Sequence, residues 1–195
     1  NGPVSIKYIK GGLRSNMVPD YVEAGILTDD KSALIKSVKE YAKKTGFALK
    51  AEDNGKMVVL KSVGLCAHGS LPQLGKNAIM QLFDFLGSLK LGKCDIAEFI
   101  EFLNKNVGFD VYGAKFGVGL EDKDSGKLSF NIGVIDMNQD KVTMAFNLRY
   151  PVTFKLDDMM TPFKERIKGT GITIENLEHQ APLYFPKDHP LIKTL

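Results

Sequence analysis

The sequence contains 195 residues, of which 44% are hydrophobic and 25% are charged, a composition typical of a globular protein with a packed core. This composition excludes collagen-like, disulfide-scaffold and intrinsically disordered proteins. The 26 basic and 23 acidic residues are interspersed and leave a net charge of +3. No basic stripe is present, so nucleic acid is not an expected partner.

Neither a membrane-spanning segment nor a secretory signal is visible in the sequence. No apolar run approaches the roughly 18 residues of a spanning helix, and residues 1–4 do not begin a basic region followed by an apolar one. Cys66 and Cys94 lack CxxC spacing, which favours reduced, buried thiols over a disulfide framework. We therefore expect a cytoplasmic protein without a membrane partner.

The first third of the chain predicts strands around one helix. Acidic residues begin the segment 29–45, basic residues end it and Gly46 follows it, and these are helix signals. Asn54 and Gly55 predict a tight hairpin turn. The strands expected here are residues 4–10, 20–27, 47–51 and 57–67.

The rest of the chain predicts three more helices and a second hairpin. Helices are expected at residues 76–91, 96–107 and 156–168, and strands at residues 127–135, 141–149 and 171–178. The element order is ββαββα and then αββαβ. We therefore expect an α+β fold of two similar units of the ferredoxin-like type, each an antiparallel sheet backed by helices, although no residue-level repeat is visible.

Several segments lack the spacing of known ligand-binding motifs. Residues 69–75 have five residues between their glycines, so they are not a phosphate loop, and residues 117–122 lack the third glycine of a dinucleotide fingerprint. Gly126 comes one position too early for residues 122–126 to begin an EF-hand, and a loop that leads into the next hairpin is expected there. The three histidines, His68, His179 and His189, are dispersed, so we expect no metal site in this chain.

Three polar residues are candidates for a functional site. His68 lies between an expected strand end and an expected helix start, where helix N–H groups favour a negatively charged ligand. Arg149 ends an expected strand, and Asn16 lies in an expected turn. On local grounds alone, the simpler interpretations are a hydrogen-bonded loop histidine, a solvated arginine and a turn residue.

The segments around these residues form a recognisable set. They are Gly-Gly-Leu-Arg-Ser-Asn-Met-Val-Pro-Asp (11–20), Ala-His-Gly-Ser-Leu-Pro-Gln-Leu-Gly-Lys-Asn-Ala-Ile (67–79) and Asn-Leu-Arg-Tyr-Pro (147–151). Together they closely resemble the lid domain of PepV-type dipeptidases, which belong to the di-zinc aminoacylase and carboxypeptidase family. The resemblance covers almost the whole chain. It implies a two-unit lid, residues 1–92 and 93–180, with residues 181–195 returning to a catalytic domain, so we expect an excised fragment.

The resemblance also implies roles for the candidate residues. His68 would be the catalytic residue that hydrogen-bonds the oxygen of the tetrahedral intermediate, while Asn16 and Arg149 would bind the carboxylate of a dipeptide with a free C-terminus. Two divalent metal ions, with zinc expected, and a glutamate general base would lie in the missing catalytic domain. That domain would be the partner of the lid, and the two-unit lid implies a monomeric parent enzyme.

Two functions of other classes fit the same topology. One is a ferredoxin-like regulatory domain that binds amino acids without catalysis. The other is an RNA-binding module, but the sequence lacks the aromatic stacking signature and the basic face of such modules.

The dispersed histidines lead to a first prediction. The isolated chain should bind neither zinc nor manganese tightly and should hydrolyse no peptide, because it has no cluster of histidine and carboxylate ligands. Isothermal titration calorimetry checks this, and a stoichiometric site with submicromolar affinity would contradict it.

Overall fold

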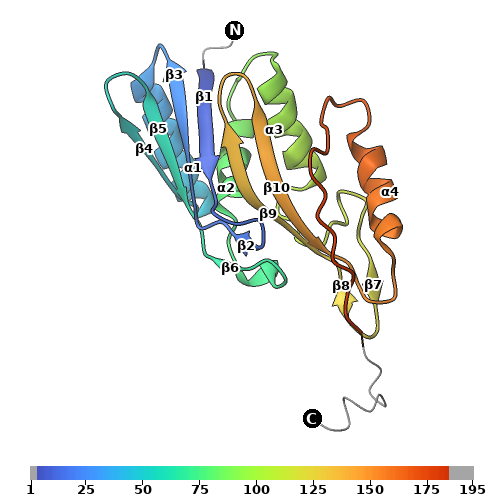
Figure 1. Ribbon diagram of the computed structural model, residues 1–195. Coiled ribbons are helices and arrows are strands. Elements are labelled where there is room, and N and C mark those ends of the chain that lie inside the picture. The colour runs from blue at the N-terminus through green and yellow to red at the C-terminus, as the bar shows by residue number, and fades with distance from the viewer. Residues whose placement is uncertain (1–3, 185–195) are drawn as a thin grey trace. The chain divides into compact units, whose positions relative to one another are not determined.

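The computed structural model describes residues 4–184, and Figure 1 shows their helices and strands. They form an α+β fold, as predicted, with four helices and a six-stranded antiparallel sheet. The chain divides into two compact units. The first comprises the described residues up to Val111 together with Ser129–Leu148, and the second comprises Tyr112–Leu128 and the described residues from Arg149 onward. The predicted lid units divide the chain at other positions, and that division stays a prediction.

The six-stranded sheet lies in the first unit, apart from the last residue of β10, and has the order β10-β9-β1-β3-β5-β4. Its strands are β1 (Val4–Gly11), β3 (Tyr21–Thr28), β4 (Ala48–Asp53), β5 (Val58–Val63), β9 (Ser129–Met137) and β10 (Val142–Arg149). β9 pairs with β1, with Ile9 opposite Met137 and Gly11 opposite Ile135. The second hairpin therefore extends the sheet of the first half of the chain.

β1 contains an irregularity that its apparent alternation does not reveal. The register with β3 shifts between Ile6, which lies opposite Ile26, and Tyr8, which lies opposite Gly25. An extra residue in one strand changes which face the following side chains occupy. Ile6 and Ile9 are consequently both buried although they are three positions apart.

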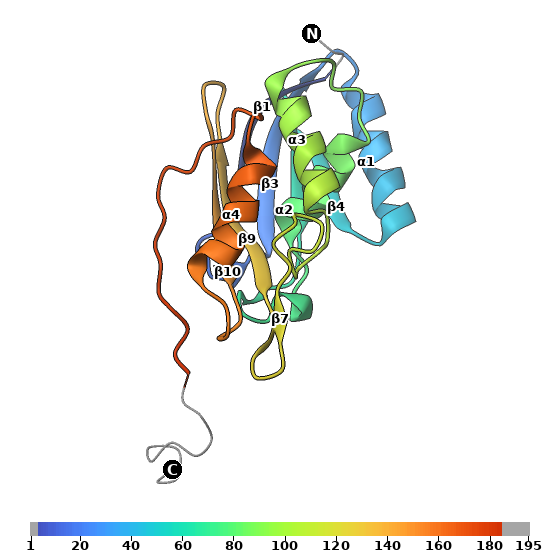
Figure 2. The same ribbon diagram turned by 90° about the vertical axis from the view of Figure 1, so that its right-hand side faces the viewer.

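Helices cover one face of this sheet, as Figure 2 shows. They are α1 (Lys31–Thr45), α2 (Ala78–Gly87) and α3 (Asp95–Asn106). α1 begins and ends where its sequence predicts, because Asp30 accepts a hydrogen bond from the Ala33 N–H and Gly46 adopts a left-handed conformation with φ 74°. α2 is buried on nearly all sides because α3 and the sheet both pack against it.

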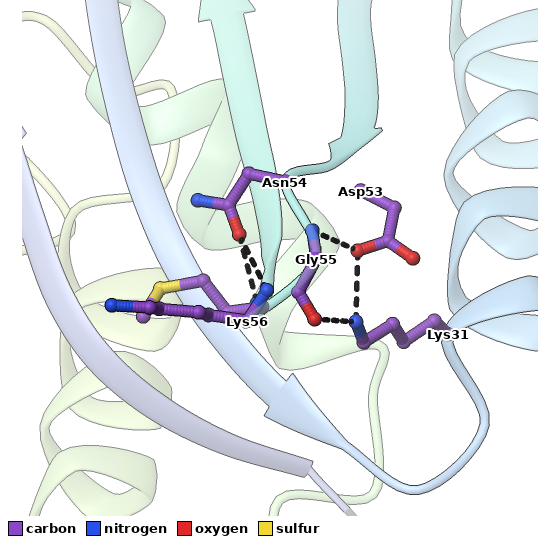
Figure 3. A network of polar contacts seen from close by, with 6 residues as sticks. Lys31, Asp53, Asn54, Gly55 and Lys56 are labelled. Atoms are coloured by element: carbon purple, nitrogen blue, oxygen red, sulfur yellow. Dashed lines mark hydrogen bonds and ion pairs between the residues drawn. The ribbon is translucent and has the colours of Figure 1, made fainter.

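The hairpin between β4 and β5 turns at Asn54 and Gly55, as predicted, through a loop of residues 54–57. Lys31 at the start of α1 donates to the Asp53 carboxylate at 2.8 Å and to the Gly55 carbonyl at 2.6 Å (Figure 3). The Asp53 carboxylate also accepts the Gly55 N–H. The bond from Lys31 and then the bond from Gly55 lower the pKa of Asp53. This network ties the hairpin to the helix.

The second unit contains a short hairpin and one helix. These elements are β7 (Glu121–Asp122), β8 (Gly126–Lys127) and α4 (Leu156–Ile167). Phe116 packs against Phe163 of α4 with ring centroids 4.7 Å apart, and Arg166 donates to the Phe116 carbonyl at 2.9 Å. Residues 122–126, expected to be a loop that leads into the next hairpin, form the turn of the short β7–β8 hairpin itself. α4 ends just before Gly169, as predicted.

The strand predicted at residues 171–178 is wrong. This segment has neither helix nor strand, and most of it is exposed. Gly171 adopts φ 79°, and no strand in the described part of the chain pairs with the residues that follow. Alternating isoleucines are insufficient here because a strand needs a neighbour to complete its backbone hydrogen bonds. The expected return to a catalytic domain at residues 181–195 lies mostly outside the described residues.

The contact between α1 and α2 leads to a prediction about alkaline pH. The Tyr41 hydroxyl donates to the Asp84 carboxylate at 2.7 Å, and burial together with this bond raises the pKa of Tyr41 to about 12. Replacing Tyr41 with Phe should lower the free energy of unfolding by about 1 kcal/mol. This stabilisation is complete below pH 10, the ordinary pKa of tyrosine, and declines as the pH rises toward 12. Urea unfolding of both proteins at pH 8 and pH 11 checks this, and an equal difference at the two values would contradict it.

The Asp122 carboxylate leads to a prediction about acid pH. It accepts hydrogen bonds from the backbone and hydroxyl of both Ser125 and Thr153, and it thereby joins the β7–β8 turn to the segment before α4. Desolvation acts to raise the pKa of Asp122, but these bonds together lower it far below its usual range. An asparagine at this position would turn its N–H₂ group toward N–H and O–H donors, and two donors cannot form a hydrogen bond. Asp122→Asn should therefore lower the melting temperature at pH 7.

The sign of the pH dependence follows from the lowered pKa. The stabilisation by Asp122 is present above about pH 4 and is lost as the pH falls through the pKa of the folded state. The difference in melting temperature between wild type and Asp122→Asn should therefore shrink in acid. Asp140→Asn, in the exposed turn between β9 and β10, is the matched control and should change little at either pH.

Candidate functional site

Two short strands bring Asn16 and His68 together in the first unit. β2 (Met17–Val18) and β6 (Ala67–His68) pair antiparallel, with Met17 opposite His68. The Gly69 N–H donates to the Asn16 carbonyl at 2.7 Å, which continues the contact by one residue. The two candidate residues, which are distant in the sequence, are therefore neighbours in the fold.

Gly69 lies close to both the Asn16 backbone and the Asn147 side chain. A Cβ atom at this position would be 2.9 Å from the Asn16 carbonyl oxygen and 3.2 Å from Oδ1 of Asn147 in β10. Any side chain would force one of these neighbours to move. Gly69 thus allows β2, β6 and β10 to meet.

The His68 ring is exposed, and one of its nitrogens has a defined role. Nδ1 lies 2.7 Å from the Ser70 hydroxyl and 3.3 Å from the Ser70 backbone nitrogen. A backbone N–H can only donate, so Nδ1 is the acceptor. The neutral imidazole then carries its proton on Nε2. His68 is consequently arranged to offer an Nε2–H donor to a ligand.

The prediction that a helix begins next to His68 is wrong. His68 is followed by a turn and by the short 3-10 helix η1 (Pro72–Leu74), and α2 starts only at Ala78. The Asn77 side chain already accepts the N–H groups of Ile79 and Met80 at the start of α2. The pairing of β6 with β2, and not a helix N-terminus, positions the histidine.

The other candidate residues have different surroundings. Asn16 is half-buried, and in the described part of the chain its side-chain amide takes part in no hydrogen bond. Arg149 is the exposed last residue of β10 and belongs to the second unit, so its convergence with Asn16 and His68 stays a prediction.

Asn147 is a neighbour of the site that the sequence did not single out. It stands two residues before Arg149, within the Asn-Leu-Arg-Tyr-Pro segment. Residues two apart share one face of a strand, so Asn147 and Arg149 share a face of β10. The Asn-Leu-Arg-Tyr-Pro segment therefore pointed to Asn147 as well as to Arg149, although only Arg149 was predicted to be a site residue.

The prediction that both cysteines are buried is also wrong, since Cys66 and Cys94 are free and exposed. Between residues 4 and 184, no three His, Cys, Asp or Glu side chains are grouped so that they could hold a metal ion. Over the same residues, no helix has both the length and the apolar character needed to cross a membrane.

Comparison with known proteins gives relatives of one kind. No family model matches the chain. It is 32% identical over 188 residues to a protein of Staphylococcus epidermidis named "Putative dipeptidase", and this alignment covers 95% of the chain and 40% of that protein. Proteins of the same description from Staphylococcus saprophyticus and Staphylococcus aureus are 32% and 30% identical, over 94% and 95% of the chain and 39% and 40% of their own lengths. The chain thus spans about two fifths of the length of these relatives, and it is similar to a part of proteins that carry the dipeptidase name.

Proposed function

We propose that this chain is the substrate-binding lid of a cytoplasmic metallodipeptidase, a hydrolase of dipeptides with a free C-terminus. The observation that carries the proposal is the β2–β6 pairing, which places Asn16 beside a histidine with a donor available on Nε2. The similarity to proteins named as dipeptidases supports the same reaction class. The activity belongs to the longer protein, and the lid alone is expected to be inactive.

His68 is the proposed catalytic residue. When water attacks a peptide carbonyl, negative charge develops on the carbonyl oxygen. A neutral imidazole donates its Nε2–H to that oxygen more strongly as the charge grows, so the bond favours the transition state over the bound substrate. One such donor is worth a factor of about 10² to 10³ in rate. Ser70 supports this role because its N–H fixes the tautomer of the ring.

Asn16 and Arg149 are the proposed carboxylate ligands. The Asn16 amide has no partner in residues 4–184 to compete with a ligand, and its backbone is fixed by Gly69. A guanidinium binds a carboxylate through two parallel hydrogen bonds. A dipeptide spans about 7 Å at roughly 3.5 Å per residue, so ligands for its two ends restrict the substrate to short peptides. Arg149 must then lie within this distance of His68 in the closed enzyme.

The two divalent metal ions, with zinc expected, are assigned to a catalytic domain outside this chain. Among residues 4–184, no three His, Cys, Asp or Glu side chains are grouped so that they could hold a metal ion, so the ligands are proposed to come from that domain. The partner of the lid would be that domain, and the parent enzyme is proposed to be a monomer. An amino-acid-sensing regulatory domain remains the alternative function, and dipeptide hydrolysis by the longer protein would exclude it.

Kinetics of the longer protein test the proposal. Dipeptide hydrolysis should be measured by release of free amino acid. His68→Ala should lower kcat by about 10² to 10³ with little change in KM, because the bond strengthens only in the transition state. Arg149→Ala and Arg149→Lys should mainly raise KM, since lysine lacks the bidentate geometry. Asn16→Ala should resemble a weaker version of the arginine change.

His179→Ala is the matched control, because His179 is exposed and hydrogen-bonds Tyr150 in the second unit. Its kcat and KM should stay close to wild type. An unchanged kcat for His68→Ala would exclude the proposed role of His68, and failure of the wild-type protein to hydrolyse any dipeptide would exclude the function.

A further inference from the structure

The turn that carries Asn16 is held by a buried side chain of β9. Asn131 is 1% exposed, and its amide nitrogen donates to the Ser15 carbonyl at 2.9 Å and to the Met17 carbonyl at 2.8 Å. These carbonyls belong to the residues on either side of Asn16. Both N–H groups of a buried amide are therefore used to fix the backbone around one candidate ligand.

The backbone of this turn lies directly on β9. A Cβ atom at Gly133, two residues after Asn131, would overlap the Ser15 and Arg14 carbonyls, and one at Gly12 would overlap the Gly133 carbonyl. The close approach brings the Ser15 and Met17 carbonyls within reach of a side chain as short as asparagine. β9 is anchored in turn, because Asn77 donates from its side chain to the Ile132 carbonyl at 2.8 Å.

The same contacts continue to His68. Met17, whose carbonyl accepts from Asn131, is the residue paired with His68. The Asn16 carbonyl accepts the Gly69 N–H directly after the histidine. A shift of the turn would therefore move both the Asn16 amide and the strand that holds the imidazole.

We propose that Asn131 is a positioning residue of the catalytic site, which holds the backbone on both sides of Asn16 and holds His68 through the Asn16–Gly69 hydrogen bond. The inference rests on the proposed function for its kinetic consequence, but the clamp itself is a property of the fold. Without the amide, the half-buried Ser15 and Met17 carbonyls lose the hydrogen bonds from Asn131, and the turn is free to move. A displacement of about 1 Å can cost about 10² in rate.

The kinetic experiment uses the longer protein with Asn131→Ala. The variant should lower kcat/KM by about 10 to 10², with both a raised KM and a lowered kcat, because it disturbs both ligands. In the Asn16→Ala background the same change should raise KM much less, since its effect on KM acts through Asn16. The kcat/KM of Asn131→Ser, which keeps one donor, should fall between the values of wild type and Asn131→Ala. This variant replaces Asn131→Ala in the test if the alanine variant does not fold.

The matched control is Asn106→Ala in α3. Asn106 is also a buried asparagine, and it donates to the Phe102 carbonyl away from the turn. The Asn106→Ala variant should lose about as much stability as Asn131→Ala, while the folded enzyme keeps the kcat and KM of wild type. Folded Asn131 variants with wild-type kcat and KM, or KM effects that add fully to those of Asn16→Ala, would overturn the proposal.

Hydrogen exchange separates the clamp from the reaction. In the same protein, Asn131→Ala or Asn131→Ser should speed exchange of the Gly69 amide by at least tenfold, whereas Asn106→Ala should leave it unchanged. Unchanged Gly69 exchange in the Asn131 variants would overturn the inference even if the enzyme is an active dipeptidase. Faster exchange in a protein without dipeptidase activity would support the clamp and exclude the proposed function.

Discussion

The pairing of β1 with β9 is the constraint on which the candidate site depends. It joins the first strand of the chain to a hairpin that comes more than a hundred residues later, with Gly11 opposite Ile135. The backbone after β1 can then cross β9 at Gly133 and accept the hydrogen bonds of Asn131. β2 follows this crossing and supplies the edge to which β6 pairs. The β2–β6 contact that brings Asn16 and His68 together therefore lies against a larger sheet to which two distant parts of the chain contribute.

Hydrogen-bonded carboxylates serve a different purpose, since they fasten turns to helices. Asp53 connects the β4–β5 hairpin to Lys31 of α1, and Asp122 connects the β7–β8 turn to Thr153 before α4. Each carboxylate has a lowered pKa because its charge is stabilised by several donors. The polar residues at Asn16 and His68 differ from these, since parts of their side chains remain available to a ligand.

Much of the fold could be predicted because its signals are local. Asp30 and Gly46 define α1, the apolar spacing defines α2 and α3, and Asn54 with Gly55 defines a hairpin. The strand expected at residues 171–178 failed because its pattern contains no information about a partner. The ladder of β2 and β6 has only two residues in each strand, too few for an alternating pattern to show. It exists only because tertiary contacts hold both segments in place.

For the candidate site, the sequence indicated Asn16 and His68 but not the hydrogen bonds from Asn131 that hold the turn around Asn16. Asn16 and His68 stood out through their motifs, whereas Asn131 lies in an ordinary apolar strand and has no local signature.

The irregularity in β1 also determines where the chain tolerates a change of length. The pleat before Ile6 and the pleat after Tyr8 are out of phase, and the extra residue between them brings both isoleucines into the core. Deletion of Lys7, the unpaired residue, would leave the two isoleucines two positions apart, and simple alternation would then keep both on the buried face. The pairs on either side of the deletion would keep their partners, because Ile26 and Gly25 are already consecutive in β3. The bulge is thus a place where β1 can lose one residue while the turn on β9 stays where it is.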